Sequence, residues 1–194
     1  MVISAFVVLG RQLAIILCFV LAVPLMVRAE GQASVYDIES KWVDQQGKPL
    51  AFKAPGIQWT VLSMAYTSCE SSCPLIIQKM QGIEKKLPTA LDGKVRFLVF
   101  SFDGKRDTVP VLAAYTVKRK LTAGNWFLLT APEDEARTLA SILDFRYKQL
   151  ANGDFSHSNQ ITLLDHSGRI VAQASDLVTA PETLLEKILS PASK

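Results

Sequence analysis

Residues 58–87 read QWTVLSMAYTSCESSCPLIIQKMQGIEKKL, and their pattern predicts the central unit of the fold. The segment up to Tyr66 places apolar side chains on both faces of an extended chain, which is typical of a strand buried in the middle of a sheet. Pro74 fits the first turn of a helix, where its missing N–H costs nothing. Apolar residues then follow at helical spacing, at Ile76, Met80, Ile83 and Leu87. The stretch therefore predicts a central strand, a short loop that holds two cysteines, and a helix that begins near Pro74.

Further strands and helices alternate along the rest of the chain. Strands are predicted at 41–52, folded as a hairpin, and then at 95–102, 126–129, 160–164 and 169–173. Helices are predicted after Thr108, at 132–143 and at 181–189, with a polar, irregular segment at 146–158. This order predicts an α/β protein with a thioredoxin-like fold, in which a central mixed sheet carries helices on both faces and an extra N-terminal hairpin.

The helix expected after Thr108 has its own start signal and its own apolar face. Asp107 and Thr108 have side chains that can cap the free N–H groups of a first helical turn. Val111, Leu112 and Tyr115 are then expected to form the inner face of that helix.

The first 29 residues predict an export signal. The apolar run at 13–27 is only 15 residues long, whereas a membrane-spanning helix needs about 20. Small residues before Ala29 suit cleavage by a signal peptidase after that residue. An uncleaved anchor built from residues 2–27 is the alternative. In either case residues 30–194 form one domain outside the cytoplasm, in the periplasm or anchored in the inner membrane and facing it.

Length and charge exclude several classes of protein. The chain has 194 residues, of which 49% are hydrophobic and 20% charged, so it can bury a full core and is not disordered. From Glu30 onward the chain contains 19 Lys and Arg residues and 18 Asp and Glu residues, so its charges nearly balance. A nucleic-acid-binding protein would show a basic face and a higher balance of positive charge, so no nucleic-acid partner is expected.

Two of the three cysteines, Cys69 and Cys73, stand four positions apart in an exported chain. A structural disulfide is one interpretation, but a bridge across so short a loop gives the smallest entropic stabilisation. A domain of this size also has enough core without a bridge. We therefore favour a functional pair. Cys18 lies in the apolar front end and is expected to act as a small apolar side chain.

The position of the pair suits reactive thiolates. Free N–H groups at the start of a helix stabilise a thiolate and lower the pKa of a nearby cysteine. Thioredoxin-type exchangers use C-x-x-C, whereas Cys69 and Cys73 form C-x-x-x-C. The additional residue lets both sulfurs point at a common third atom, which favours a shared metal without forbidding a disulfide.

His157 is the candidate third ligand. Folds of this type normally hold an X-Pro pair before the strand that faces the cysteines, and this proline blocks metal binding. The chain has no proline between Pro132 and Pro181, and His157 occupies the corresponding stretch. Two thiolates and an imidazole suit Cu(I) and Cu(II), with zinc as the chemical competitor. A histidine without a metal is the alternative.

Three segments together resemble the Sco/SenC family of copper proteins. Residues 66–74, YTSCESSCP, resemble its Y-T-x-C-x-x-x-C-P signature, and residues 101–108, SFDGKRDT, are similar to its S-x-D-P-x-x-D-T segment. Residues 156–158, SHS, precede an apolar strand, as does the family's ligand histidine. The segments occur in the family's order, and the resemblance covers residues 34–189.

The resemblance implies that Cys69, Cys73 and His157 bind a copper ion, as Cu(I) or Cu(II). It also implies a role in assembling the dinuclear copper centre of cytochrome c oxidase. Such a protein would deliver copper to the copper-accepting subunit or reduce that subunit's cysteines, and it would depend on a thiol reductant. It would be a metallochaperone rather than an enzyme. The chain departs from the family pattern at Glu70 and Gly104, where many relatives have proline.

The two cysteines also allow a second function. A dedicated thiol–disulfide oxidoreductase would need only Cys69 and Cys73 as its redox-active pair and would tolerate the loss of His157. A thiol peroxidase is less favoured, because no second polar or basic partner adjoins Cys69 in the sequence.

Three other side chains have simpler interpretations. Asp103 lies either beside the metal ligands or in a turn that it stabilises. His166 is expected to be exposed in a hairpin turn. Met64 and Met80 fit core positions.

Overall fold

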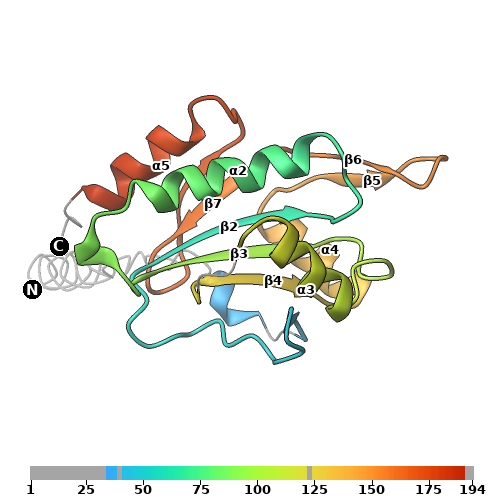
Figure 1. Ribbon diagram of the computed structural model, residues 1–194, viewed down its shortest axis with the longest axis horizontal. Coiled ribbons are helices and arrows are strands. Elements are labelled where there is room, and N and C mark those ends of the chain that lie inside the picture. The colour runs from blue at the N-terminus through green and yellow to red at the C-terminus, as the bar shows by residue number, and fades with distance from the viewer. Residues whose placement is uncertain (1–33, 39–40, 122–123, 191–194) are drawn as a thin grey trace, which may run out of the picture. The chain divides into compact units, whose positions relative to one another are not determined.

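The computed structural model describes residues 34–38, 41–121 and 124–190 (Figure 1). A six-stranded sheet forms the centre, in the order β1-β4-β3-β2-β7-β8. Its strands are β1 (Val43–Asp44), β2 (Trp59–Ala65), β3 (Val95–Ser101), β4 (Trp126–Thr130), β7 (Ile161–Leu164) and β8 (Ile170–Ala174). The helices are α2 (Ser72–Lys85), α3 (Val109–Lys118), α4 (Glu133–Ile142) and α5 (Ala180–Leu189), with short 3₁₀ turns at Val35–Asp37 and Thr89–Leu91.

The sheet is mixed, as the sequence predicts. Strands β2, β3 and β4 are parallel, and β1, β7 and β8 pair antiparallel to their neighbours. Helices α2 and α5 lie side by side on one side of the strands, and α4 lies behind the strands in the same view (Figure 1). Helices on both faces of a central mixed sheet confirm the predicted thioredoxin-like α/β fold.

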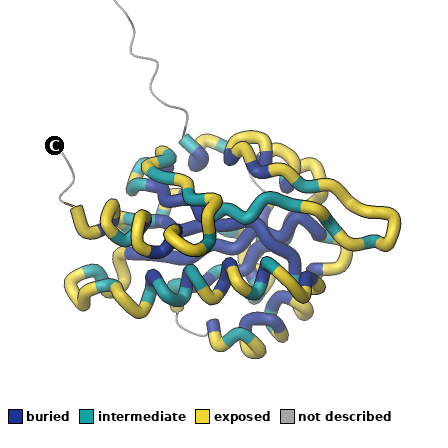
Figure 2. The backbone as a smooth tube through the Cα atoms, turned by 90° about the horizontal axis from the view of Figure 1, so that it is seen from above, coloured by how far each residue is buried: buried dark blue, intermediate teal, exposed yellow. Residues whose placement is uncertain are grey.

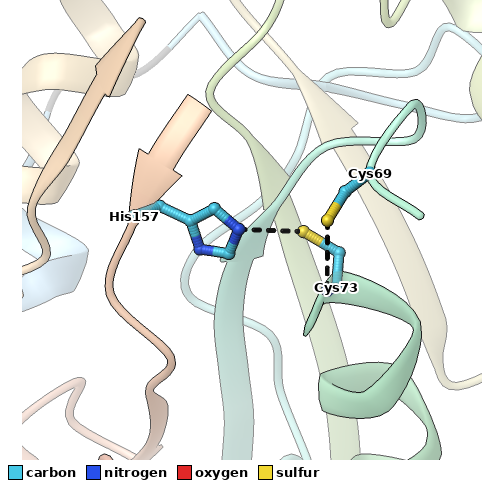
Figure 3. A group of neighbouring side chains, drawn as sticks. All are labelled: Cys69, Cys73 and His157. Atoms are coloured by element: carbon cyan, nitrogen blue, oxygen red, sulfur yellow. Dashed lines mark hydrogen bonds between the residues drawn. The ribbon is translucent and has the colours of Figure 1, made fainter. Parts of the chain in front are cut away.

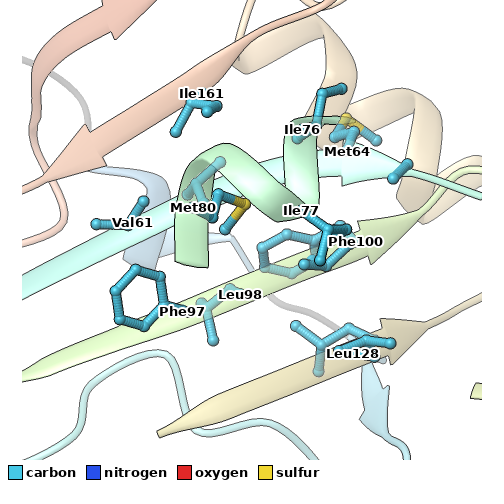
Figure 4. Close-up of a cluster of buried hydrophobic side chains, with 14 of the residues drawn as sticks. Val61, Met64, Ile76, Ile77, Met80, Phe97, Leu98, Phe100, Leu128 and Ile161 are labelled. Atoms are coloured by element: carbon cyan, nitrogen blue, oxygen red, sulfur yellow. The ribbon is translucent and has the colours of Figure 1, made fainter. Parts of the chain in front are cut away.

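The core lies between the sheet and its helices. Strands β2 and β3 are buried along almost their whole length, whereas the outward sides of the helices are exposed (Figure 2). Figure 4 shows residues of α2 packed above these strands, among them Ile76, Ile77 and Met80, all buried. Met64 and Met80 are fully buried, as predicted. Burying each such side chain contributes about 1.5–3 kcal/mol, so this layer fixes α2 on the sheet.

The predicted hairpin at 41–52 is present as a reverse turn. The backbone N–H of Asp44 donates to the carbonyl of Lys48 at 2.9 Å, and that of Leu50 donates to the carbonyl of Trp42 at 2.9 Å. The Asp44 carboxylate also accepts from the backbone N–H of Gln46 at 2.8 Å, which closes the turn. Only the first arm becomes a strand, because β1 pairs with β4, whereas the second arm meets it in a single bridge between Val43 and Pro49.

The prediction of an irregular segment at 146–158 is wrong. Residues Tyr147–Gln149 form β5 and residues Phe155–His157 form β6, which pair antiparallel as a separate two-stranded ribbon. The turn between them contains Asn152 and Gly153, and Gly153 has a φ of 84°. An Asn-Gly pair is a strong hairpin signal, and it was the observation that could have identified this ribbon.

The inner face of α3 also differs from the prediction. Leu112 and Tyr115 are buried as expected, but the side chain of Val111 is 38% exposed. The helix buries Thr116 in its place. Residues three and four positions after Leu112 share its face, whereas Val111 lies on the outer side.

The predicted export signal at 1–29 and Cys18 lie outside the described residues. Among the residues that the structure describes, no helix is long and apolar enough to cross a membrane.

Two glycines allow a matched test of the fold. A Cβ at Gly104 would lie 2.2 Å from the carbonyl oxygen of Ala131, whereas a Cβ at Gly82, inside α2, would meet no atom within 4 Å. We expect Gly104→Ala to lower the free energy of unfolding by about 1–3 kcal/mol through overpacking. Gly82→Ala should raise it by about 0.5–1 kcal/mol, because alanine loses less backbone entropy in a helix.

Urea unfolding of the two variants and the parent chain, followed by circular dichroism, measures both changes. Equal midpoints for Gly104→Ala and the parent would contradict the close approach of these two loops.

Candidate metal centre

The cysteine pair lies where β2 leaves the sheet and α2 begins. Cys69 is in the connecting loop and Cys73 is in the first turn of α2. The backbone N–H of Cys73 points at the sulfur of Cys69, with a distance of 3.4 Å between N and Sγ (Figure 3). Cys73 is fully buried and Cys69 is 5% exposed. One of the free N–H groups at the start of the helix is therefore directed at a thiol, as the sequence predicts.

His157 reaches the same point from β6. Its Nε2 lies 3.6 Å from the Sγ of Cys73 and 3.2 Å from the Oγ of Ser72. Its Nδ1 lies 2.8 Å from the carbonyl oxygen of Ser158. A carbonyl can only accept a hydrogen bond, so Nδ1 carries a proton, and Nε2 is the ring nitrogen that faces Ser72 and the cysteines.

The three side chains meet the requirement for a metal site. The ligand atoms of Cys69, Cys73 and His157 all lie within 4.8 Å of one another, although the histidine is 84 residues away from Cys73 in the chain. Among the described residues this is the one such group. Two sulfurs and one imidazole nitrogen form a soft donor set that suits copper or zinc. The bond between Nδ1–H and a backbone carbonyl is the support that metal-binding histidines usually have.

The two thiols differ in acidity. Burial opposes ionisation of Cys69, but hydrogen bonds led by the backbone N–H of Cys73 outweigh it and lower the pKa of Cys69 to about 6. Burial raises the pKa of Cys73, and the nearby charge of Cys69 adds to this effect. At neutral pH Cys73 is therefore a protonated thiol beside the thiolate of Cys69, and its Sγ lies 3.6 Å from the Nε2 of His157.

Asp107 supports the cysteine loop instead of capping α3. Its carboxylate accepts from the backbone N–H of Thr67 at 3.0 Å, from the Thr67 hydroxyl at 2.5 Å and from the Ser101 hydroxyl at 2.6 Å. Thr108 is the N-cap of α3 and makes no side-chain cap bond. Asp107 is fully buried, and burial raises its pKa. The predicted capping role of Asp107 is thus wrong, because its contact with Thr67 spans 40 residues and leaves no local sequence signal.

The structure decides between the two interpretations of Asp103. Its backbone carbonyl accepts from the N–H groups of Arg106 at 3.0 Å and Asp107 at 2.9 Å, and its carboxylate pairs with the Arg106 side chain. Asp103 therefore stabilises the turn and does not touch the cysteines or His157. His166 is exposed in its hairpin turn, as expected.

Aromatic rings pack around His157. The centroid of its ring lies 5.9 Å from that of Tyr66, 5.4 Å from that of Phe102 and 6.1 Å from that of Phe145. Contacts of this kind restrict the ring to one orientation. The sequence pattern did not single out these residues, because apolar side chains in strands and loops are normally part of the core.

The sequence profile of one family, described as SCO1/SenC, matches residues 29–192, which is most of the chain. The chain belongs to the SCO1/SenC family. A SCO1 protein homolog from Bacillus subtilis (strain 168) is 24% identical over 150 residues, which cover 75% of this chain and 77% of that protein. The predicted family membership is therefore confirmed.

Solved structures of Sco proteins share the fold. The structure of Arabidopsis thaliana ScoI with copper bound is 19% identical, with a TM-score of 0.62 over 81% of this chain and 96% of that one. The structure of BsSco, described as a member of the Sco family of cytochrome c oxidase assembly proteins, is also 19% identical. Its TM-score is 0.65 over 81% of this chain and 95% of that one.

The SCO1/SenC chain also lacks the blocking proline of thioredoxin-type exchangers. The described residues contain no cis peptide bond, and the loop between His157, at the end of β6, and β7 holds Ser158, Asn159 and Gln160. The imidazole therefore faces the cysteines directly before a segment that has no proline.

The difference in acidity predicts a difference in reactivity. In the reduced, metal-free chain, iodoacetamide should alkylate Cys69 with a rate that rises through a midpoint near pH 6, because only the thiolate reacts. Cys73 should remain unmodified at neutral pH, because it is buried and protonated. Peptide mass spectrometry identifies the labelled residue.

Ser71→Ala provides the comparison. The Oγ of Ser71 lies 3.7 Å from the Sγ of Cys69, so its removal should shift the midpoint upward. Equal labelling of both cysteines, or a midpoint near the ordinary value of 9.0, would refute this description of the pair.

Proposed function

We propose that this SCO1/SenC protein binds copper through Cys69, Cys73 and His157 and supports maturation of the dinuclear copper centre of cytochrome c oxidase. The observation that supports it most is the convergence of two sulfurs and an imidazole nitrogen within 4.8 Å. Sulfur donors suit Cu(I), and the imidazole nitrogen extends the set to Cu(II). The copper-bound ScoI structure of Arabidopsis thaliana is consistent with this cargo.

Copper binding requires the reduced form of the pair. A disulfide between Cys69 and Cys73 would leave no thiolate ligands, and the buried Cys73 must release its proton when the metal binds. Both cysteines belong to the junction between β2 and α2, whereas His157 belongs to a separate ribbon. An acceptor can therefore replace the histidine first while both sulfurs still hold the ion.

The proposed location and partners follow from the front end of the chain and from the family. Residues 1–29 would direct residues 30–194 out of the cytoplasm, either as a cleaved signal or as a membrane anchor. The copper-accepting subunit of cytochrome c oxidase, or another copper protein, would take the ion. A thiol reductant would keep Cys69 and Cys73 reduced.

A thiol–disulfide oxidoreductase is the second candidate, and the unequal acidity of the two cysteines favours it. The Cys69 thiolate would attack a partner's disulfide and release one partner thiolate. Cys73, once deprotonated, would then attack the mixed disulfide and release the second partner thiol. The products are a reduced partner and a Cys69–Cys73 disulfide, which an external dithiol would reduce again. A disulfide switch has been identified in BsSco, which shares the fold of this chain.

The two histidines of the chain separate these functions. In the reduced chain under anaerobic conditions, His157→Ala should weaken Cu(II) binding by about tenfold or more, because a nitrogen ligand is lost. The loss of Cu(I) affinity should be smaller, because the thiolates dominate binding of the softer ion. His166→Ala is the matched control, since His166 is exposed in a turn, and it should bind like the parent.

Absorption of the sulfur-to-copper charge-transfer band follows Cu(II), and competition with a chromophoric chelator follows Cu(I). Equal losses for the two ions would contradict the assigned role of His157. A titration without a charge-transfer band, in which the thiols are only oxidised, would favour the oxidoreductase.

A further inference from the structure

The ribbon that carries His157 cannot hold its position by strand pairing alone. Strands β5 and β6 have three residues each and are not part of the six-stranded sheet. An isolated two-stranded hairpin is at best marginally stable in water. Residues 148–152 at its outer end are exposed. The position of the histidine therefore depends on contacts between the ribbon and the rest of the protein.

Arg106 makes several of these contacts. Its Nη2 donates to the carbonyl oxygen of Gly153, in the ribbon turn, at 2.9 Å. Its Nε donates to the carboxylate of Asp103. The centre of its guanidinium lies 5.6 Å from the ring centroid of Phe155, in β6, and 5.8 Å from that of Tyr66. One side chain thus joins the turn, the ribbon and the loop that follows β2.

The ion pair in this group differs from an ordinary surface pair. The side chain of Asp103 is only 6% exposed, while that of Arg106 is 42% exposed. Exposed ion pairs contribute little, but here one partner is buried and its backbone carbonyl is held by two N–H groups of the same turn. Asp103 therefore fixes the guanidinium in a direction that reaches Gly153.

A second contact lies beside the first. The Tyr66 hydroxyl donates to the carboxylate of Asp154, in the ribbon, at 2.5 Å. Tyr66 also packs against the rings of Phe155, at 5.2 Å, and His157, at 5.9 Å. The guanidinium of Arg106 thus adjoins both the hydrogen-bonded tyrosine and the histidine's own strand.

The turn from Ser101 to Asp107 therefore contacts both halves of the site. Asp107 binds Thr67, two residues before Cys69, and Arg106 binds the ribbon that ends in His157. We propose that Arg106 is a positioning residue that fixes the ribbon and thereby sets the place of the His157 imidazole opposite the cysteines. The effect of Arg106 on the ribbon is independent of any metal, whereas its effect on copper binding rests on the proposed function.

The first measurement uses the reduced, metal-free full chain in mild detergent. Hydrogen exchange followed by mass spectrometry should show about tenfold faster exchange of the peptide spanning 147–158 in Arg106→Ala, because its charged hydrogen bond to Gly153 is lost. Peptides from β2 and β3 should exchange as in the parent. Lys105→Ala removes the same charge from the same turn, and its side chain is 88% exposed. It should leave the ribbon unchanged.

Arg106→Lys tests the geometry of the side chain. Lysine keeps the charge but has no planar fork to bind Asp103 and Gly153 together. Its ribbon should exchange faster than that of the parent and no faster than that of Arg106→Ala. Parental exchange in both Arg106 variants, or equal acceleration in Lys105→Ala, would overturn the proposal.

The second measurement adds Cu(II) to the same variants. In Arg106→Ala the affinity should fall about tenfold, and nitrogen coupling in the electron paramagnetic resonance spectrum should weaken. The alkylation midpoint of Cys69 should move upward, because a hydrogen bond from His157 helps to lower its pKa, while Cys73 should stay unmodified. This separates a displaced histidine from general loosening of the site, which would expose Cys73. Faster exchange with unchanged copper affinity and spectrum would overturn the role in placing His157. If the parent itself binds no copper, the proposed function fails, and the exchange result still decides whether Arg106 holds the ribbon.

Discussion

Strand β2 is hydrogen-bonded on both edges, to β3 in parallel and to β7 antiparallel, and this two-sided pairing fixes where the chain can leave the sheet. Its register with β3 is continuous from Trp59 to Ala65. The cysteine loop begins at the next residue, so its starting point cannot shift without breaking that ladder. The packing of α2 on the same strands fixes the other end of the loop. Cys69 and Cys73 are therefore held between two elements of the core.

A second consequence of this junction is the unequal chemistry of two identical side chains. The backbone N–H of Cys73, at the start of α2, is directed at the sulfur of Cys69, whereas the side chain of Cys73 is fully buried. Hydrogen bonds outweigh burial at the first sulfur, whereas burial outweighs them at the second. His157 lies against the protonated member and adds a nitrogen donor. The same arrangement thus serves metal binding when both protons leave and thiol chemistry when only one does.

The sequence predicted the parts of the molecule that depend on local pattern. The apolar side chains on both faces of 58–66, the spacing after Pro74 and the absence of a proline near His157 were enough for the central unit and for the three ligand candidates. The roles of Asp107 and Arg106 could not be predicted in this way, because their contacts with Thr67 and Gly153 cross 40 and 47 residues. The ribbon was missed for another reason. Its strands have three residues each, which is too short to show an alternation of apolar and polar side chains. Only the Asn152-Gly153 pair indicated a hairpin.

The separation of the ribbon from the main sheet has a consequence for how such a protein can diversify. Its two strands pair only with each other, and His157 stands opposite Tyr147 at the end farthest from the turn. The exposed residues 148–152 can therefore be exchanged without altering the strand register, as long as the Gly153 carbonyl still meets Arg106. His157 and the exposed surface beside it therefore belong to a ribbon outside the main sheet. Substitutions on that surface can change which partner protein binds, while the two cysteines and the core keep their sequence.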